Sequence, residues 1–144
     1  MKEYIIETKI NAPKEVVWKT ITNFEDYPSW NSILTMKNND SLQVGKKFDV
    51  TIHKPKGKKS KFKVIALSKN DNKSFSARQK VMGNWFLSAT HHFIIEEINK
   101  NQVMFIQKWE LKGIVISLFK KQIFKELESF NQMNEELKNL LEKE

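Results

Sequence analysis

The amino-acid sequence predicts an α+β fold in which an antiparallel β-sheet packs on one long C-terminal helix. Two patterns predict this fold. Over most of the chain, apolar and polar residues alternate at strand spacing, and short turn sequences join the alternating segments. From Val115 to Glu142 there is no Gly or Pro, and apolar residues recur every three or four positions. A chain of 144 residues has the length of one domain, so we expect residues 1–144 to form a single domain.

The first strand is expected over Tyr4 to Ile10, and two short helical elements follow it. Asn11 is a residue type that caps helix starts, and Pro13 suits the first helical turn, where its missing N–H costs nothing. An apolar stripe at helical spacing then continues for less than three turns. A second short element over residues 26–30 ends in the large aromatic Trp30.

The remaining strands follow from alternation, and Gly, Pro, Asn and Asp mark the connections. The expected strands are Ile33 to Lys37, Lys47 to His53, Phe62 to Ala66, Phe75 to Val81, Leu87 to Ile98 and Gln102 to Leu111. The expected turns lie at residues 38–40, 55–57, 69–72 and 99–101. Successive strands joined by short turns predict a meandering antiparallel sheet.

The segment Val115 to Glu142 predicts one amphipathic helix of roughly 40 Å, from the helical rise per residue. Its apolar stripe and the apolar face of the sheet are expected to bury each other. If the sheet curls, the space between the two becomes too wide for side chains to fill. A cavity between sheet and helix is then the natural result.

Three segments, in order along the chain, carry a family resemblance. Residues 10–31 read INAPKEVVWKTITNFEDYPSWN, residues 86–93 read FLSATHHF, and residues 110–113 read ELKG. The last helix adds Phe130, Asn134, Leu137, Lys138 and Glu142. Together they resemble the START-like (SRPBCC) superfamily, in its polyketide-cyclase/dehydrase and lipid-transport branch. The resemblance implies a helix-grip fold, with a curved antiparallel sheet wrapped around the C-terminal helix and two short helices after the first strand. One fold hosts many functions, so the resemblance does not select an activity.

The resemblance also implies a cavity, and alternation indicates which side chains would face it. A mostly aromatic wall with a few polar groups is typical of a small-molecule site. The expected lining residues are Trp30, Phe75, Ala77, Gln79, Trp85, His91, Phe93, Phe105, Gln107, Trp109, Ile116, Phe119, Ile123 and Leu127. The alternative is a filled core, because aromatic side chains are normally inside. The resemblance favours the cavity.

His91 is the weak catalytic candidate, because an imidazole can act as a general acid or base near neutral pH. Alternation places no carboxylate on the same face of a neighbouring strand, so a hydrogen-bonding wall or a core histidine is the preferred interpretation. The adjacent His92 points to the opposite face, so the two cannot bind one metal ion. The chain has no Cys and its four Gly are scattered, which excludes thiolate metal sites and a glycine-rich phosphate loop. We expect no metal and no cofactor.

The positive charge is concentrated in residues 46–63, which hold eight Lys against one acidic residue. The tip of this predicted hairpin could touch an anionic surface through Lys54, Lys56, Lys58 and Lys59. The preferred alternative is a solvated hairpin whose lysines prevent edge pairing with another strand. Specific nucleic-acid recognition is not expected, because Arg78 is the only arginine in the sequence.

Three functional classes remain. The first is a binding or carrier protein for a hydrophobic small molecule, such as a lipid or a polyketide-like aromatic compound. The second is a cyclase, dehydrase or hydrolase that uses His91 with Gln79 or Gln107 to polarise a carbonyl group. The third is an interaction module similar to the chaperone-ATPase activators that share the implied fold. The carrier is preferred, because no catalytic constellation is visible. No apolar run of 18 residues and no signal-peptide pattern occur, and the lack of Cys suits a reducing compartment, so we expect a cytoplasmic protein.

Overall fold

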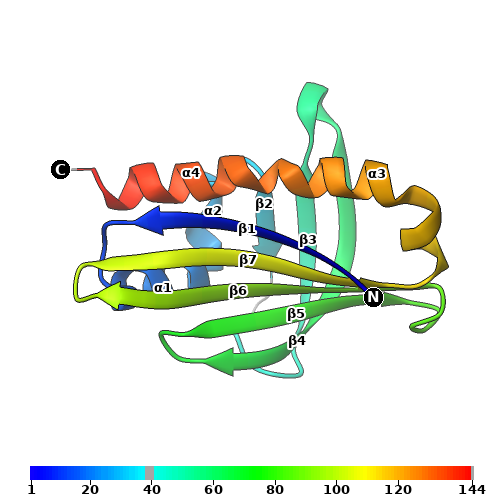
Figure 1. Cartoon of the computed structure of the whole chain (residues 1–144), viewed down its shortest axis with the longest axis horizontal. Coiled ribbons are helices and arrows are strands. Elements are labelled where there is room, and N and C mark those ends of the chain that lie inside the picture. The colour runs from blue at the N-terminus through cyan, green and yellow to red at the C-terminus, as the bar shows by residue number, and fades with distance from the viewer. Residues whose placement is uncertain (38–40, 144) are drawn as a thin grey trace.

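Seven strands of the described residues form one curled antiparallel sheet, and the C-terminal helix packs along its inner side (Figure 1). The computed structural model describes residues 1–37 and 41–143, so the turn expected at 38–40 lies outside the described residues. The strand order is β1-β7-β6-β5-β4-β3-β2. The elements are β1 (Lys2–Ile10), α1 (Lys14–Thr22), η1 (Phe24–Asp26), α2 (Tyr27–Trp30), β2 (Leu34–Lys37), β3 (Lys47–His53), η2 (Pro55–Gly57), β4 (Lys59–Asn70), β5 (Ser74–Val81), β6 (Leu87–Asn99), β7 (Gln102–Lys112), α3 (Ile114–Glu128) and α4 (Phe130–Leu141). The predicted α+β fold class is confirmed.

The curl of the sheet coincides with two irregularities in strand pairing. The register shifts between Ala66 and Ser68 on β4, and again between Glu97 and Asn99 on β6. A bulge of this kind bends its strand and increases the local twist. In Figure 1, β2 and β3 consequently run steeply across the direction of β1 and β7. Strands β2, β3 and β4 can therefore lie opposite β6 and β7, with the C-terminal helix between the two groups.

The first short helix lies where the apolar stripe after Pro13 predicts it, but the predicted cap is wrong. Pro13 is the N-cap of α1 and no side chain caps this helix, while Asn23 is its C-cap. The side-chain oxygen of Asn11 instead accepts a hydrogen bond of 2.8 Å from Nε2 of Gln102. The backbone N–H of Asn11 donates to the Glu142 carboxylate. Asn11 therefore joins the end of β1 to β7 and to the C-terminus of α4.

The C-terminal helix covers the predicted segment but is not one uninterrupted cylinder. Only Ser129 separates α3 from α4, and its hydroxyl donates to the Glu126 carbonyl at 2.6 Å. Phe119 has φ −121° and ψ 26°, which departs from helical geometry within α3. Figure 1 shows the first turns of α3 bent away from the long axis that the rest of the helix follows. The predicted long C-terminal helix is confirmed, with a kink at Phe119 and a break at Ser129 that the apolar spacing did not indicate.

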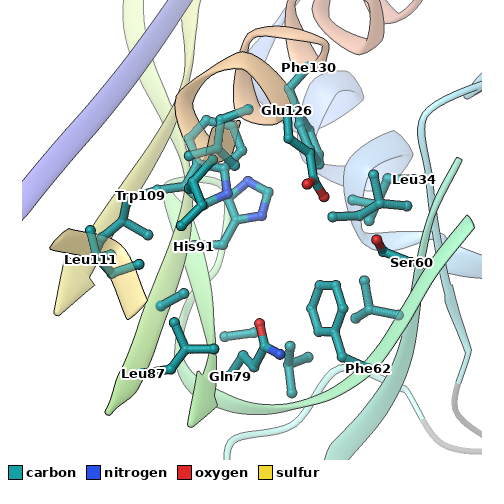
Figure 2. A pocket seen from close by; sticks show the side chains of 18 of the residues that line it. Leu34, Ser60, Phe62, Gln79, Leu87, His91, Trp109, Leu111, Glu126 and Phe130 are labelled. Atoms are coloured by element: carbon teal, nitrogen blue, oxygen red, sulfur yellow. The ribbon is translucent and has the colours of Figure 1, made fainter. Parts of the chain in front are cut away.

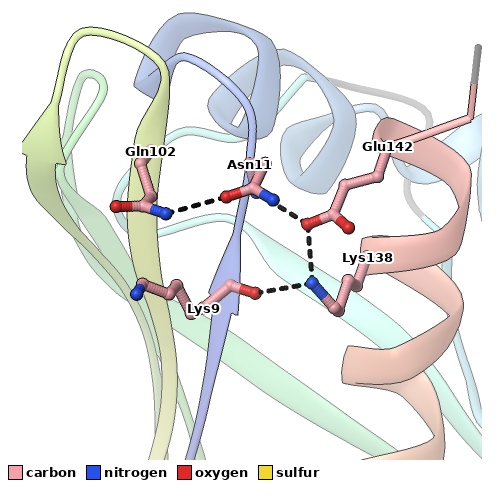
Figure 3. A network of polar contacts seen from close by, with 5 residues as sticks. All are labelled: Lys9, Asn11, Gln102, Lys138 and Glu142. Atoms are coloured by element: carbon pink, nitrogen blue, oxygen red, sulfur yellow. Dashed lines mark hydrogen bonds and ion pairs between the residues drawn. The ribbon is translucent and has the colours of Figure 1, made fainter.

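Polar contacts hold the far end of α4 on the edge of the sheet (Figure 3). Nζ of Lys138 donates to the Lys9 carbonyl at 3.2 Å and to Oε2 of Glu142 at 2.7 Å. The same Glu142 oxygen accepts the Asn11 N–H at 2.7 Å. The hydrogen bond from Lys138 and then that from Asn11 hold the pKa of the Glu142 carboxyl below its usual range. This network joins the last helical turn to β1.

Replacing Glu142 by Gln should lower the free energy of unfolding by about 1 kcal/mol, because two charge-assisted hydrogen bonds lose their anionic acceptor. The carboxylate contributes this stability above the pKa of its unfolded form, and the contribution is lost as pH falls through its lowered native pKa. Urea unfolding at pH 7 measures the loss. The control is Glu135→Gln, since Glu135 is an exposed residue of the same helix. Equal stability of the two variants would contradict the role of the network.

Aromatic side chains fill the end of the core next to the short helices. The ring of Phe75 stacks on Phe93 with a centroid distance of 4.3 Å and meets the edges of Trp18 and Phe24 at 6.0 and 5.8 Å. Phe24 also packs against Phe48 at 5.4 Å. This aromatic cluster occupies the space between the sheet and the short helices. Toward the other end of the sheet, under α3, the interior holds a pocket.

Candidate ligand pocket

A pocket of about 290 Å³ lies between the inner face of the sheet and α3. This volume is at the lower end of the range found for small-molecule sites, about 300–1,000 Å³. Figure 2 shows His91 and Trp109 on one side, Ser60 and Phe62 on the other, and Glu126 above them. The lining residues are Leu34, Met36, Val50, Ile52, Ser60, Phe62, Val64, Ala77, Gln79, Leu87, Ala89, His91, Phe93, Trp109, Leu111, Val115, Ile116, Ile123, Glu126, Leu127 and Phe130.

Eight of the residues expected from the sequence lie on this wall. They occupy the inward positions of β5, β6 and β7 and the apolar stripe of α3. They are Ala77, Gln79, His91, Phe93, Trp109, Ile116, Ile123 and Leu127. Alternation located the strand residues among them because neighbouring strands in register present the same face to the same space.

Four other expected residues pack against neighbouring side chains instead of lining the pocket; three are buried and Trp30 is half-buried. Phe75 belongs to the aromatic cluster near α1. Trp30 packs at 5.1 Å on Tyr27, whose ring contacts Phe24 of that cluster. Gln107 is fully buried under α4, where its amide contacts Asn134, and Phe105 is fully buried two residues earlier on the same face of β7. Helix α4 lies directly on β1 and β7, so these inward side chains meet the helix and not a cavity.

The remaining two expected residues lie on the outside of the molecule. Trp85 is 65% exposed in the connection between β5 and β6, where its ring packs on Phe86. Phe119 is 48% exposed, at the point where α3 departs from helical geometry. The kink interrupts the apolar stripe on which the prediction for Phe119 depended.

Sequence reasoning missed the opposite wall of the pocket. Leu34, Met36, Val50, Ile52, Ser60, Phe62 and Val64 reach it from β2, β3 and β4. Alternation along residues 33–37, 47–53 and 62–66 does mark these inward positions, Ser60 excepted, but only the curl of the sheet brings them opposite His91. Glu126 was also missed, although it follows Ile123 by three positions and so shares its helical face.

His91 is the most constrained polar side chain of the wall. Its ring stacks on Phe93 and Trp109 with centroid distances of 3.9 and 4.3 Å, and its Nε2 lies 2.8 Å from Oε1 of Gln107. The ring keeps some accessible surface because it faces the cavity, although it lies deep within the protein. Burial lowers the pKa of His91 to about 3, with the Gln107 hydrogen bond opposing the shift and the His92 charge adding to it. The imidazole is therefore neutral at pH 7.

His92 points to the outer face of the sheet, as alternation predicts. There its Nε2 contacts the carboxylate of Glu110, which extends from the neighbouring β7. This pair is separated from the pocket by the sheet itself. Among residues 1–37 and 41–143, no three His, Asp or Glu side chains are grouped in a way that could hold a metal ion.

The basic hairpin formed by β3, η2 and β4 projects past the C-terminal helix (Figure 1). Lys54, which follows β3 directly at the start of the hairpin turn, forms an ion pair of 3.3 Å with Glu126. The Glu126 side chain is 32% exposed and also lines the pocket, so the pocket wall reaches the surface beside this ion pair. One of the four lysines proposed for anionic contact is thus already paired within the protein. In the described part of the chain, no helix is both long and apolar enough to cross a membrane.

Comparison with known proteins identifies the fold. No family model matches the sequence, and no curated protein matches it. Among solved structures, a START superfamily protein from Mycobacterium smegmatis is 16% identical with a TM-score of 0.72, over 97% of both chains. A second protein from that species has a TM-score of 0.77 at 14% identity and covers 99% of this chain and 91% of its own. Truncated norcoclaurine synthase from Thalictrum flavum has a TM-score of 0.74 at 12% identity, over 99% and 94% of the two chains.

These likenesses define the class of structure to which the chain conforms. It has the START-like helix-grip fold, in which a curled antiparallel sheet grips a long C-terminal helix. The resemblance found in residues 10–31, 86–93 and 110–113 is confirmed at the level of the fold. The neighbours include an enzyme as well as proteins of no stated activity, so the fold alone does not select a function.

Proposed function

We propose that this protein binds a hydrophobic small molecule, such as a lipid or a polyketide-like aromatic compound, in the pocket under α3 and acts as its carrier. The observation that carries the proposal is the lining of the pocket. Of its described lining residues, all but Ser60, Gln79, His91 and Glu126 are apolar. A concave apolar wall with a few polar groups is how small-molecule sites are built.

The state of His91 favours binding over catalysis by this residue. With a pKa of about 3, its imidazole is a weak base at pH 7, far from the value that makes a general base effective. Its Nε2 is occupied by an amide, Gln107, and not by a carboxylate that would orient it and stabilise its charged form. The cyclase or dehydrase alternative would therefore need a different catalytic group. A cytoplasmic location remains part of the proposal, supported by the absence of Cys.

The proposal is tested with N-phenyl-1-naphthylamine, a neutral apolar fluorophore. Trp109 lines the pocket, so binding should brighten the fluorophore and quench tryptophan emission. Replacing Ala89 by Phe should fill part of the pocket and weaken binding about tenfold, which is about 1.4 kcal/mol. Native mass spectrometry of the purified protein should in addition reveal co-purified apolar material.

The matched control is Leu118→Phe, because Leu118 lies on the outside of α3 and is 69% exposed. This variant should bind the fluorophore like the wild-type protein. Thermal unfolding of both variants shows whether the fold is kept. If the Ala89→Phe variant binds the fluorophore as strongly as the wild type, the fluorophore binds elsewhere. If none of a panel of neutral apolar compounds binds the wild-type protein, the carrier proposal is contradicted.

A further inference from the structure

His91 is hydrogen-bonded to a buried chain of amide side chains. Nε2 of Gln107 donates to Oδ1 of Asn134 at 2.6 Å, and Nδ2 of Asn134 donates to the Thr8 hydroxyl at 3.0 Å. Gln107 and Asn134 are both fully buried. The same Gln107 nitrogen also lies 3.6 Å from Sδ of Met133. A thioether sulfur can only accept a hydrogen bond, so this contact identifies the end of Gln107 that carries the N–H groups.

This orientation determines which nitrogen of His91 carries its proton. The Gln107 atom that faces His91 is Oε1, at 2.8 Å, and an amide oxygen can only accept. Nε2 of His91 must therefore carry hydrogen and donate to it. Since the ring is neutral, Nδ1 is unprotonated and presents a lone pair.

The Nδ1 atom is available to a ligand. No described residue forms a hydrogen bond with it, and the ring faces the pocket (Figure 2). Stacking on Phe93 and Trp109 prevents the ring from turning away. His91 thus offers a hydrogen-bond acceptor in a fixed direction, in a wall that is otherwise nearly apolar.

The charges of the lining residues restrict the chemical class of the ligand further. No Lys or Arg is among the described lining residues, and the single charged one is the acidic Glu126. Lys54 is already paired with this carboxylate. A carboxylate or phosphate buried in the pocket would therefore lose its hydration without gaining a cationic partner.

We propose that the ligand is a neutral apolar molecule with a hydroxyl or N–H group that donates a hydrogen bond to Nδ1 of His91. This inference rests on the proposed binding function and names the chemical class of the ligand. His91 is then the residue that selects hydrogen-bond donors over ethers, ketones and acids of the same shape. Leaving this buried acceptor without a donor disfavours an otherwise identical ligand.

Two probes that differ in one hydrogen-bond donor test the inference: 2-naphthol and 2-methoxynaphthalene. Isothermal titration calorimetry should show that the wild-type protein binds the naphthol about tenfold more tightly than the ether. His91→Phe keeps an aromatic ring but lacks the acceptor, and it should bind both probes with similar affinity. The matched control is His92→Phe on the outer face, which should keep the preference for the naphthol.

A measurement on the wild-type protein serves as a second test in case the His91 variant does not fold. Nitrogen NMR of the His91 ring should show hydrogen on Nε2 and a bare Nδ1, whose resonance moves on addition of 2-naphthol and not of 2-methoxynaphthalene. Hydrogen on Nδ1, or equal affinity for the two probes, would overturn the inference and leave the carrier proposal intact. Binding of neither probe would count against both.

Discussion

Replacing Gly113 by Ala is expected to lower the free energy of unfolding by about 4 kcal/mol, the sum of a strained backbone and a steric clash. Gly113 joins β7 to α3 with φ +110°, a conformation that residues with a side chain rarely adopt. A Cβ atom at this position would lie 2.2 Å from the carbonyl oxygen of Phe86. That carbonyl is held in place because it accepts the N–H of Val115 at 3.1 Å. The backbone must shift to make room.

Gly45→Ala is the matched control for this prediction. Gly45 has φ +90°, but a Cβ atom there would meet nothing within 4 Å. Replacing Gly45 by Ala should lower the free energy of unfolding only through backbone strain, by about 1 to 2 kcal/mol. Urea unfolding of both variants measures the difference, and equal losses would mean that the approach of Phe86 to Gly113 is unimportant. Because Val115 and Ile116 line the pocket directly after this turn, the Gly113→Ala variant should also bind N-phenyl-1-naphthylamine more weakly.

Acid should destabilise the protein through His91, by about 1.4 kcal/mol for each pH unit below 6.5. Burial holds the native pKa of His91 near 3, while the unfolded chain has the ordinary value of 6.5. Between these values the unfolded state binds a proton that the native state does not, so lowering the pH favours unfolding. At pH 5 the expected loss relative to pH 7 is about 2 kcal/mol from this residue alone. The loss stops increasing below about pH 3, where the native ring is also protonated.

His91→Phe isolates this effect, because the variant has no proton to bind at the site. Urea unfolding at pH 7, 6, 5 and 4 gives the free energy of each protein, and the stability of the wild type relative to the variant should fall steadily as pH falls. Glu142, whose pKa is also shifted, is present in both proteins, and its contribution cancels in the difference. Parallel curves for the two proteins would contradict the buried, neutral state of His91. The variant itself should be less stable at pH 7, because Oε1 of Gln107 loses its donor.

Local patterns predicted much of this structure. Alternation located the strands, and the change to three- and four-residue spacing located the C-terminal helix, because both patterns follow from which face of an element is buried. The cap of the first helix was predicted wrongly, since Asn11 has a competing partner, Gln102, that lies 91 residues away in sequence. The kink at Phe119 also has no signal in the apolar spacing.

Of the described residues that line the pocket, eight are residues that the sequence analysis expected there. Ala77, His91 and Trp109 lie where inward alternation on adjacent strands places them. Alternation predicts on which face of the sheet a side chain lies. It does not predict whether that side chain meets a helix, another aromatic ring or open space. Phe75 and Gln107 point inward as expected, and yet one meets an aromatic cluster and the other meets α4.

The sequence by itself determined the order and kind of the elements and which side chains face inward, because those properties depend on neighbours within a few residues. Only the tertiary structure decided where the interior stays open, because this depends on how far the sheet curls and where the helix bends. It also decided the chemistry of His91. Asn134 and the sulfur of Met133 orient Gln107, and Gln107 in turn determines which nitrogen of the imidazole carries the proton. Contacts between residues 91, 107 and 133 exist only once the sheet and helix have packed together.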